Sequence, residues 1–389
     1  MLAHSPPLPL VIDYLCFDGN DLDEEEEQDI ILALEQRERV RYIHLSMTVL
    51  NLQKLIMFID EEYPTLESLI LAPPNEVNYT SLILPETLQA PRLRHLTLFE
   101  VALPTGSRLL ITAVGLVTLC LTMTHPTYIQ PAVLLQWLSF LPRLENLIYL
   151  SCPDLFSDLE RQPVQTPITT HVTLPNLRSF AVEGASSYLE ALFHRITAPR
   201  LEKLQIGFFK QVTSSVLWLQ QFMDTTENVG FDRAKLGFYD GRVYVEAYPL
   251  EAKTASFSIN VLCLHFDWQV SSVAQIFNEL SQMFSAVEHL SLKHEEHNSE
   301  SSEEHDEVDR TEWRKLLRPF GNVKTLHIGN GLVEELSRCL RLEDGELPLE
   351  VLPELLELTY SGSGNAGDAF TSFTDSCRNA GRPVTLIQL

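Results

Sequence analysis

A short apolar phrase, L-x-x-L-x-L with occasional Val, Ile, Phe or Tyr, recurs about a dozen times from end to end of the chain. The clearest copies begin at Leu66, Leu93, Leu116, Leu144, Leu177, Leu201, Val287, Val323 and Leu355, and weaker copies begin at Val40, Ile259 and Val384. Each phrase predicts a strand whose apolar positions point inward while the x positions point outward. A phrase repeated at this period predicts a solenoid in which each unit packs on its neighbours.

The segments between the phrases have a helical period. Apolar stripes with i, i+3, i+4, i+7 spacing begin at Leu52, Leu134, Leu189, Val273, Trp313 and, more thinly, Phe370. Pro131 suits a first helical turn, and Ser272 and Thr311 suit N-caps. One strand and one helix per repeat predict an α/β leucine-rich-repeat solenoid of the ribonuclease-inhibitor-like kind, with a curved parallel sheet inside and helices outside.

We therefore expect one repeat domain over residues 1–389, with three irregular regions. Residues 1–39 are expected to form an irregular first repeat with an acidic loop. Residues 226–249 carry two β-rich runs around Asp240-Gly241, which predicts a hairpin inserted into the array. Residues 294–310 are rich in acid and serine and are predicted to be a disordered loop.

The net charge of −25 excludes several partners. Much of the excess acid lies in Asp18 to Asp29 and Glu295 to Glu312, which we interpret as solvated loops. Such a surface repels phosphate backbones, so nucleic acid is not an expected partner. The longest apolar run, Leu109 to Leu121, is too short to span a membrane, and no membrane partner is expected.

The six cysteines show no C-x-x-C spacing, which favours free thiols in a reducing compartment. The start of the chain has neither a basic segment nor an apolar core of the signal-peptide kind. We therefore expect a cytoplasmic or nuclear protein.

Two short sequence strings resemble functional motifs. Gly362 to Gly367 reads G-x-G-x-x-G between a predicted strand and a predicted helix, but no acidic residue follows on the next strand to hold a ribose. His294, His297 and His305 lie among carboxylates, although a loop offers them no fixed ligand geometry. We expect no cofactor, no metal site and no enzymatic activity, and a nucleotide-dependent enzyme is the remaining alternative on the glycine string alone.

Several phrases resemble one protein family. They are Met1-Leu-Ala-His-Ser-Pro-Pro-Leu-Pro-Leu, Leu141-Pro-Arg-Leu-Glu-Asn-Leu, Ala198-Pro-Arg-Leu-Glu-Lys-Leu, Trp313 to Leu326 and Leu352 to Gly364. They look like the repeat region of the F-box and leucine-rich-repeat proteins of mushroom-forming fungi. In that family the F-box docks on the Skp1 adaptor of a cullin ubiquitin ligase and the repeats are presumed to choose the substrate. No F-box precedes the repeats here, so we expect a Skp1-type adaptor only if one is encoded upstream.

The sequence therefore predicts a non-enzymatic protein-recognition scaffold, related to ubiquitin-ligase substrate receptors. The alternatives are a free-standing inhibitor-like repeat protein and a repeat face with no evolved ligand. The expected partner surface is the concave sheet, whose outward positions are mixed, small and modestly apolar. The candidate residues are Tyr42, His44, Ser68, Ile70, His95, Thr97, Asn146, Ile148, Lys203, Gln205, His289, Thr325 and His327.

Overall fold

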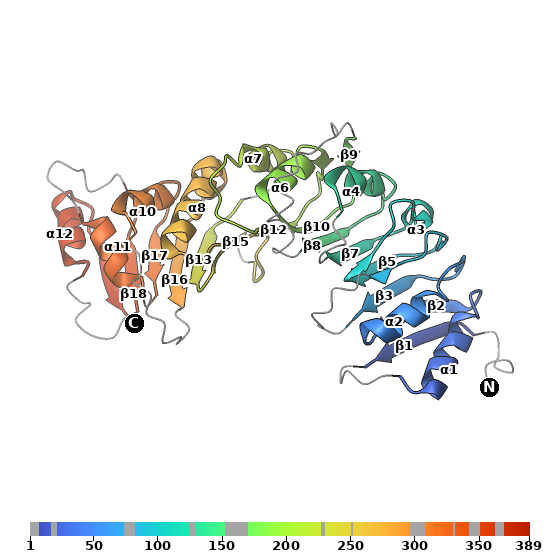
Figure 1. Ribbon diagram of the computed structural model, residues 1–389. Coiled ribbons are helices and arrows are strands. Elements are labelled where there is room, and N and C mark those ends of the chain that lie inside the picture. Colours follow the sequence, from blue (N-terminus) through green and yellow to red (C-terminus); the bar gives the residue numbers. More distant parts are fainter. Residues whose placement is uncertain are drawn as a thin grey trace. The chain divides into compact units, whose positions relative to one another are not determined.

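The computed structural model describes residues 8–16, 22–73, 82–123, 129–151, 170–226, 230–249, 252–295, 308–329, 331–341, 351–361 and 369–389. Residue contacts divide the chain into two compact units, Met1–Leu201 and Glu202–Leu389. Helices and strands form separate layers in each unit, and each unit has a mostly parallel sheet (Figure 1). The protein is thus of the mixed α/β class.

The sheet of the first unit is parallel. Its strands, in spatial order, are β1 (Leu10–Leu15), β2 (Val40–Ser46), β3 (Ser68–Ala72), β5 (His95–Phe99), β7 (Thr118–Met123), β8 (Asn146–Ser151) and β10 (Ser179–Gly184). The helices are α1 (Glu24–Leu34), α2 (Val49–Ile56), α3 (Arg108–Thr112), α4 (Pro131–Leu138) and α6 (Ser186–Phe193). Two short parallel pairs stand apart from the sheet: β4 (Leu82–Ile83) with β6 (Val101–Ala102), and β9 (Val172–Thr173) with β11 (Ile196–Thr197).

The second unit has a sheet in which spatial and chain order differ. Its strands, in spatial order, are β12 (Lys203–Phe208), β15 (Phe257–Leu262), β14 (Arg242–Tyr248), β13 (Arg233–Tyr239), β16 (His289–Glu295), β17 (Thr325–Ile328), β18 (Glu357–Tyr360) and β19 (Thr385–Gln388). The helices are α7 (Leu217–Met223), α8 (Phe266–Glu279), α9 (Ser281–Phe284), α10 (Arg310–Leu317), α11 (Val333–Leu340) and α12 (Thr371–Asn379).

The predicted hairpin is confirmed, but it belongs to the sheet. Strands β13 and β14 pair antiparallel, and Gly241 takes a left-handed φ of 78° in the turn between them. Strand β14 also pairs antiparallel with β15, while β13 pairs parallel with β16. The hairpin therefore supplies two strands of the sheet, between β15 and β16, and does not project from it as an insertion.

The leucine phrases form strands because their second and third apolar positions align from one strand to the next. Leu69 pairs with Leu96, Leu96 with Leu119, and Leu119 with Leu147, and all four side chains are completely buried. Neighbouring parallel strands lie about 5 Å apart, so aligned leucines contact along the whole row. These ladders and the apolar stripes of the helices together make the core.

Two of the weak phrases were placed in the wrong register. In β15 the buried side chains are Phe257, Ile259 and Val261, and Leu264 is 83% exposed. In β19, Leu386 aligns with Leu358, which leaves Ile387 36% exposed. A shift of one residue moves all the inward side chains of a strand to the other face of the sheet. The buried side chains of these two strands therefore follow simple alternation and not the L-x-x-L-x-L phrase.

The first acidic stretch is helical where the structure describes it. Glu24 to Glu27 form the first turn of α1, and the side chain of Asp23 accepts a hydrogen bond from the Glu26 amide at 2.7 Å. Carboxylates near a helix N-terminus are stabilised by the helix dipole, so an acidic run here favours helix and not loop. Residues 17–21 lie outside the described residues, as do residues 296–307 of the second acidic stretch.

The predicted helix caps have a mixed outcome. Pro131 is in the first turn of α4, as predicted. Ser272 lies inside α8, whose N-cap is His265, and its hydroxyl accepts a hydrogen bond from the Val212 amide at 3.0 Å. The N-cap of α10 is Asp309, which accepts a hydrogen bond from the Thr311 amide at 2.8 Å. A serine or threonine before an apolar run was therefore an insufficient signal.

Candidate functional site

The strand face is the side of each sheet that carries the side chains alternating with the buried apolar ladders. Every candidate residue predicted from the sequence lies on a strand of this face. Ser68, at 8% exposure, is buried, and the other candidates are half-buried or exposed. Twelve of the thirteen candidates are therefore accessible on the strand face, and Ser68 is not.

In the first unit the register brings the candidates into two rows. Tyr42, Ser68 and His95 align in one row and continue through Thr118 to Asn146. The second row consists of His44, Ile70, Thr97, Cys120 and Ile148.

These rows carry little charge. The His44 ring Nδ1 lies 3.0 Å from Asp13 Oδ1, and the Tyr42 and His44 rings meet edge to face with centroids 6.3 Å apart. Burial raises the pKa of the Cys120 thiol, so this thiol is neutral at physiological pH. The face of the first unit therefore combines small polar and aliphatic groups, as the sequence predicted.

The candidates of the second unit fall into two groups. Lys203 and Gln205 lie on β12, whereas His289, Thr325 and His327 lie on β16 and β17. The His289 ring Nδ1 and the Thr325 hydroxyl are 2.6 Å apart. Three strands, β15, β14 and β13, lie between the two groups.

Sequence reasoning missed the outward residues of these intervening strands. On β14, the Arg242 guanidinium lies over the Tyr244 ring at 5.3 Å and donates a hydrogen bond to its hydroxyl at 2.9 Å. Beside it, Lys235 Nζ on β13 lies 4.9 Å from the centroid of the Tyr248 ring. The available signal was the strict alternation of these residues with apolar ones, which the interpretation as an insertion set aside.

A hollow of about 210 Å³ opens on this part of the strand face. Its lining residues are Lys235, Leu236, Gly237, Tyr239, Tyr244, Glu246, Ser291 and Lys293, and we call it the Gly237 hollow. The Tyr239 and Tyr244 rings stand nearly perpendicular, at 83°, with centroids 5.6 Å apart. Glu246 accepts a hydrogen bond from the Tyr248 hydroxyl, and burial, followed by this bond, raises the pKa of Tyr248 to about 12.

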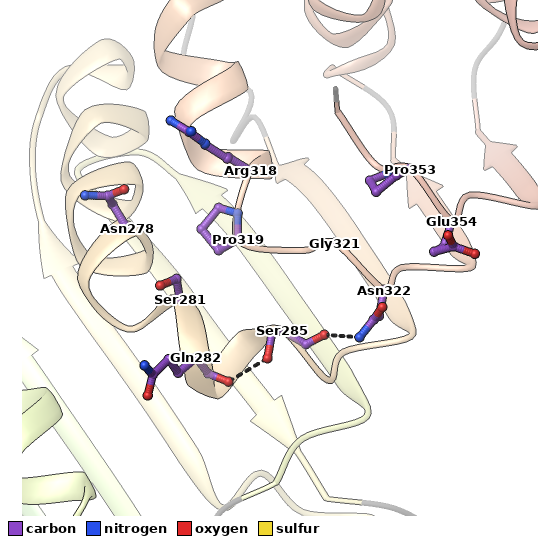
Figure 2. A pocket seen from close by; sticks show the side chains of 10 residues that line it. All are labelled: Asn278, Ser281, Gln282, Ser285, Arg318, Pro319, Gly321, Asn322, Pro353 and Glu354. Atoms are coloured by element: carbon purple, nitrogen blue, oxygen red, sulfur yellow. Dashed lines mark hydrogen bonds between the residues drawn. The ribbon is translucent and has the colours of Figure 1, made fainter. Parts of the chain in front are cut away.

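A second hollow of about 620 Å³ lies among the turns that connect helices to strands (Figure 2). Several of its polar groups bond one another: the Asn322 amide donates to the Ser285 carbonyl, and the Ser285 hydroxyl donates to the Gln282 carbonyl, each at 2.7 Å. The charged residues of its lining are Arg318 and Glu354, and Glu354 is paired with Arg382. This hollow offers hydrogen bonds but no paired nucleophile and base.

Most residues of the two strings that resemble functional motifs lie outside the described residues. This holds for Gly362 to Gly367, His297 and His305. His294 is described, and its ring packs on Phe266 with centroids 5.0 Å apart. Within the described ranges, no group of three or more His, Cys, Asp or Glu side chains is arranged to hold a metal ion.

No described helix has the length and apolar character needed to cross a membrane. Comparison with known protein families found no match, and comparison with curated proteins found none either. The fold and the chemistry of the strand face are therefore the basis for any statement about function.

Proposed function

We propose that the protein is a leucine-rich-repeat solenoid that recognises a protein partner on its strand face. The aligned leucine ladders and the alternation of strand and helix support the repeat architecture. Repeat arrays characteristically present their sheet as an extended binding surface, because each repeat adds one strand to it.

The observation that carries the proposal is the second row of the first unit. Ile70, Thr97, Cys120 and Ile148 stand side by side on four adjacent strands, and none of them carries a charge. A row that is depleted in charge resembles the core of a protein interface, where charged residues are scarce. A continuous surface of this kind suits another protein better than a small molecule, which needs a concave pocket.

The relation to F-box proteins is part of this proposal. The repeat phrases resemble the substrate-binding region of that family, and a substrate receptor requires such a surface. A free-standing inhibitor-like protein would use the same surface without a ubiquitin ligase. Partner identity separates the two, because only the first would yield proteins that accumulate when the protein is removed.

Affinity purification with quantitative mass spectrometry tests the proposal. We expect Thr97→Arg combined with Ile148→Arg to remove the specific partners, because two long cations would interrupt the row. The matched control is Ile111→Arg on α3, where the side chain is 49% exposed on the helical side. Both proteins should keep the wild-type melting temperature within a few degrees. Partners that survive the double change but disappear with the control would place recognition on the helices and refute the proposal.

A further inference from the structure

The strand face of the second unit differs in charge from the rest of the chain. On β13, β14 and β16, the outward side chains that the structure describes include four basic residues and one acidic residue. The basic ones are Arg233, Lys235, Arg242 and Lys293, and the acidic one is Glu246. The chain as a whole carries a net charge of −25. A local excess of cations on so acidic a protein marks a surface complementary to an anion.

The Gly237 hollow lies at the centre of this cationic surface. Gly237 pairs with Tyr244 on one side and with Lys293 on the other. A Cβ atom at Gly237 would lie 2.6 Å from Cε2 of Tyr239, so the Tyr239 ring packs over the space that a side chain at this position would occupy. Lys235, two residues before Gly237, points to the same side of the sheet.

The two lysines of the hollow are available to a ligand. Within the described part of the chain, Lys235 and Lys293 make no ion pair, and the recorded partner of Lys235 is the Tyr248 ring. Glu246 is held by the Tyr248 hydroxyl at 2.5 Å. Burial and, second, the nearby Lys293 charge lower the pKa of His327, which pairs with the lining residue Ser291.

The volume of the hollow limits the size of the ligand that it can bind. Pockets for free small molecules have volumes of about 300–1,000 Å³. At about 210 Å³ the Gly237 hollow is smaller and suits a single side chain. Tyrosine rings supply contact area at low entropic cost, and lysines supply point charges for carboxylate or phosphate oxygens.

We propose that the Gly237 hollow is a subsite for one anionic side chain, a glutamate, an aspartate or a phosphorylated residue, of the protein partner. This inference rests on the proposed function, since it assigns part of the same strand face to a specific feature of the partner. It predicts a preference for acidic or phosphorylated segments.

A peptide array probed with the purified full-length chain tests the inference. The peptides share a degenerate sequence and differ at one central position, which is phosphoserine, glutamate, serine or lysine. We expect binding of the phosphoserine and glutamate peptides to exceed that of the serine and lysine peptides by about tenfold or more, the effect of one good charged contact. A greater signal for phosphoserine than for glutamate would identify phosphate as the source of the charge, and the reverse would identify carboxylate.

Variants place the binding in the hollow. Lys235→Gln with Lys293→Gln should abolish the preference, and the corresponding arginine pair should retain it. Gly237→Ala should weaken binding without changing the charge, because its Cβ displaces the Tyr239 ring. The matched control is Lys315→Gln on α10, which also removes a cation but lies on the helical side, paired with Glu312 at 2.7 Å. Equal binding of all four peptides, or a preference unchanged in the glutamine pair, would overturn the inference.

Failure of the inference and failure of the proposed function are distinguishable. If partners depend on Thr97 and Ile148 but not on Lys235 and Lys293, recognition by the strand face stands and the anionic subsite is refuted. If the peptides bind through the lysines while no cellular partner depends on the strand face of the first unit, the subsite stands and the proposed function fails. Stronger lysine-dependent binding of a single-stranded RNA oligonucleotide than of the phosphopeptide would refute the assignment to a protein side chain.

Discussion

Tyr63 offers a sharp test of how the first unit is held together. It lies in the segment that connects α2 to β3, and its side chain is completely buried. Its hydroxyl lies 3.1 Å from the carbonyl of Leu34, the last residue of α1, and 3.1 Å from the carbonyl of Phe58, just after α2. One phenolic proton is thus shared between two helix ends that lie 24 residues apart in the chain.

The substitution Tyr63→Phe removes this proton and keeps the ring. Because the ring remains, no large cavity forms, and the cost comes from carbonyl groups that lose their donor in a dry environment. Such a loss destabilises by about 1–3 kcal/mol. For a unit of about 200 residues this corresponds to a fall in melting temperature of about 2–12 °C.

Urea unfolding followed by hydrogen exchange and mass spectrometry of peptides from β2 and β3 measures this change within the unit. The matched control is Tyr42→Phe, because the Tyr42 hydroxyl makes no hydrogen bond within the described part of the chain. We expect this change to alter the free energy of unfolding by less than about 0.5 kcal/mol. We expect a lower urea midpoint with an unchanged slope for Tyr63→Phe alone. Equal midpoints for the two variants would refute the claim that the Tyr63 hydroxyl stabilises the unit.

The same pair of proteins has an alkaline signature. Burial raises the pKa of Tyr63 to about 12, whereas the unfolded chain releases this proton near its ordinary pKa of about 10. Below pH 10 both states hold the proton, and the full advantage over Tyr63→Phe is present. As pH rises from 10 towards 12 the unfolded state alone ionises, so the advantage should shrink. A constant difference over this range would contradict the assignment.

Three further substitutions test local features of the second unit, each measured by urea unfolding. Ser272→Ala should destabilise by about 1–3 kcal/mol, because it leaves the Val212 amide without its acceptor in a buried site; an effect below about 0.5 kcal/mol would contradict this. Gly241→Ala should cost about 1–2 kcal/mol through its left-handed φ, and Gly241→Asn should cost less; equal values would argue against backbone strain. Phe257→Ala should lower the free energy of unfolding by about 3–5 kcal/mol and Leu262→Ala by much less; the reverse order would support the register predicted from the L-x-x-L-x-L phrase.

Most strands could be predicted because the phrase contains two independent signals. The spacing of its second and third apolar positions predicts a strand, and its recurrence predicts a parallel neighbour with the same register. At β15 and β19 the spacing of apolar residues does not determine the register, because adjacent apolar residues allow two registers. In β15 the antiparallel pairing with β14 accompanies the register seen, in which Val245 lies opposite Ile259. No pattern within β15 alone could supply that partner.

The acidic run before residue 30 shows a different limit. Four successive glutamates suggest a solvated loop when charge alone is considered. Ile30 and Leu34, however, are buried four residues apart on the far side of the same helix. Asp23 caps it, and the dipole favours carboxylates in its first turn. The apolar stripe of this helix and its N-cap residue together predict a helix, even though the charge alone suggests a loop.

The candidate surface was predictable in position but incomplete in chemistry. The x positions of the phrases lie on the strand face as expected, since alternation is local. The cationic and aromatic part of the face lies on the hairpin, which contains no leucine phrase. Only the pairing of β13 with β16 and of β14 with β15 shows that these residues share the face.

Glycines explain why a long cation fits in this sheet. Lys293 is aligned with Gly237 on one side, and on the other side a Cβ added at Gly329 would come within 3.1 Å of the Lys293 Cγ. Parallel strands place side chains of one row about 5 Å apart, so a lysine between two bulky neighbours would be pushed away from the sheet. With a glycine on either side, its stem can lie along the surface while its ammonium group borders the hollow. The packing of the Tyr239 ring over Gly237 and the position of the Lys293 cation thus have one origin, the alternation of glycine with large residues across the strands.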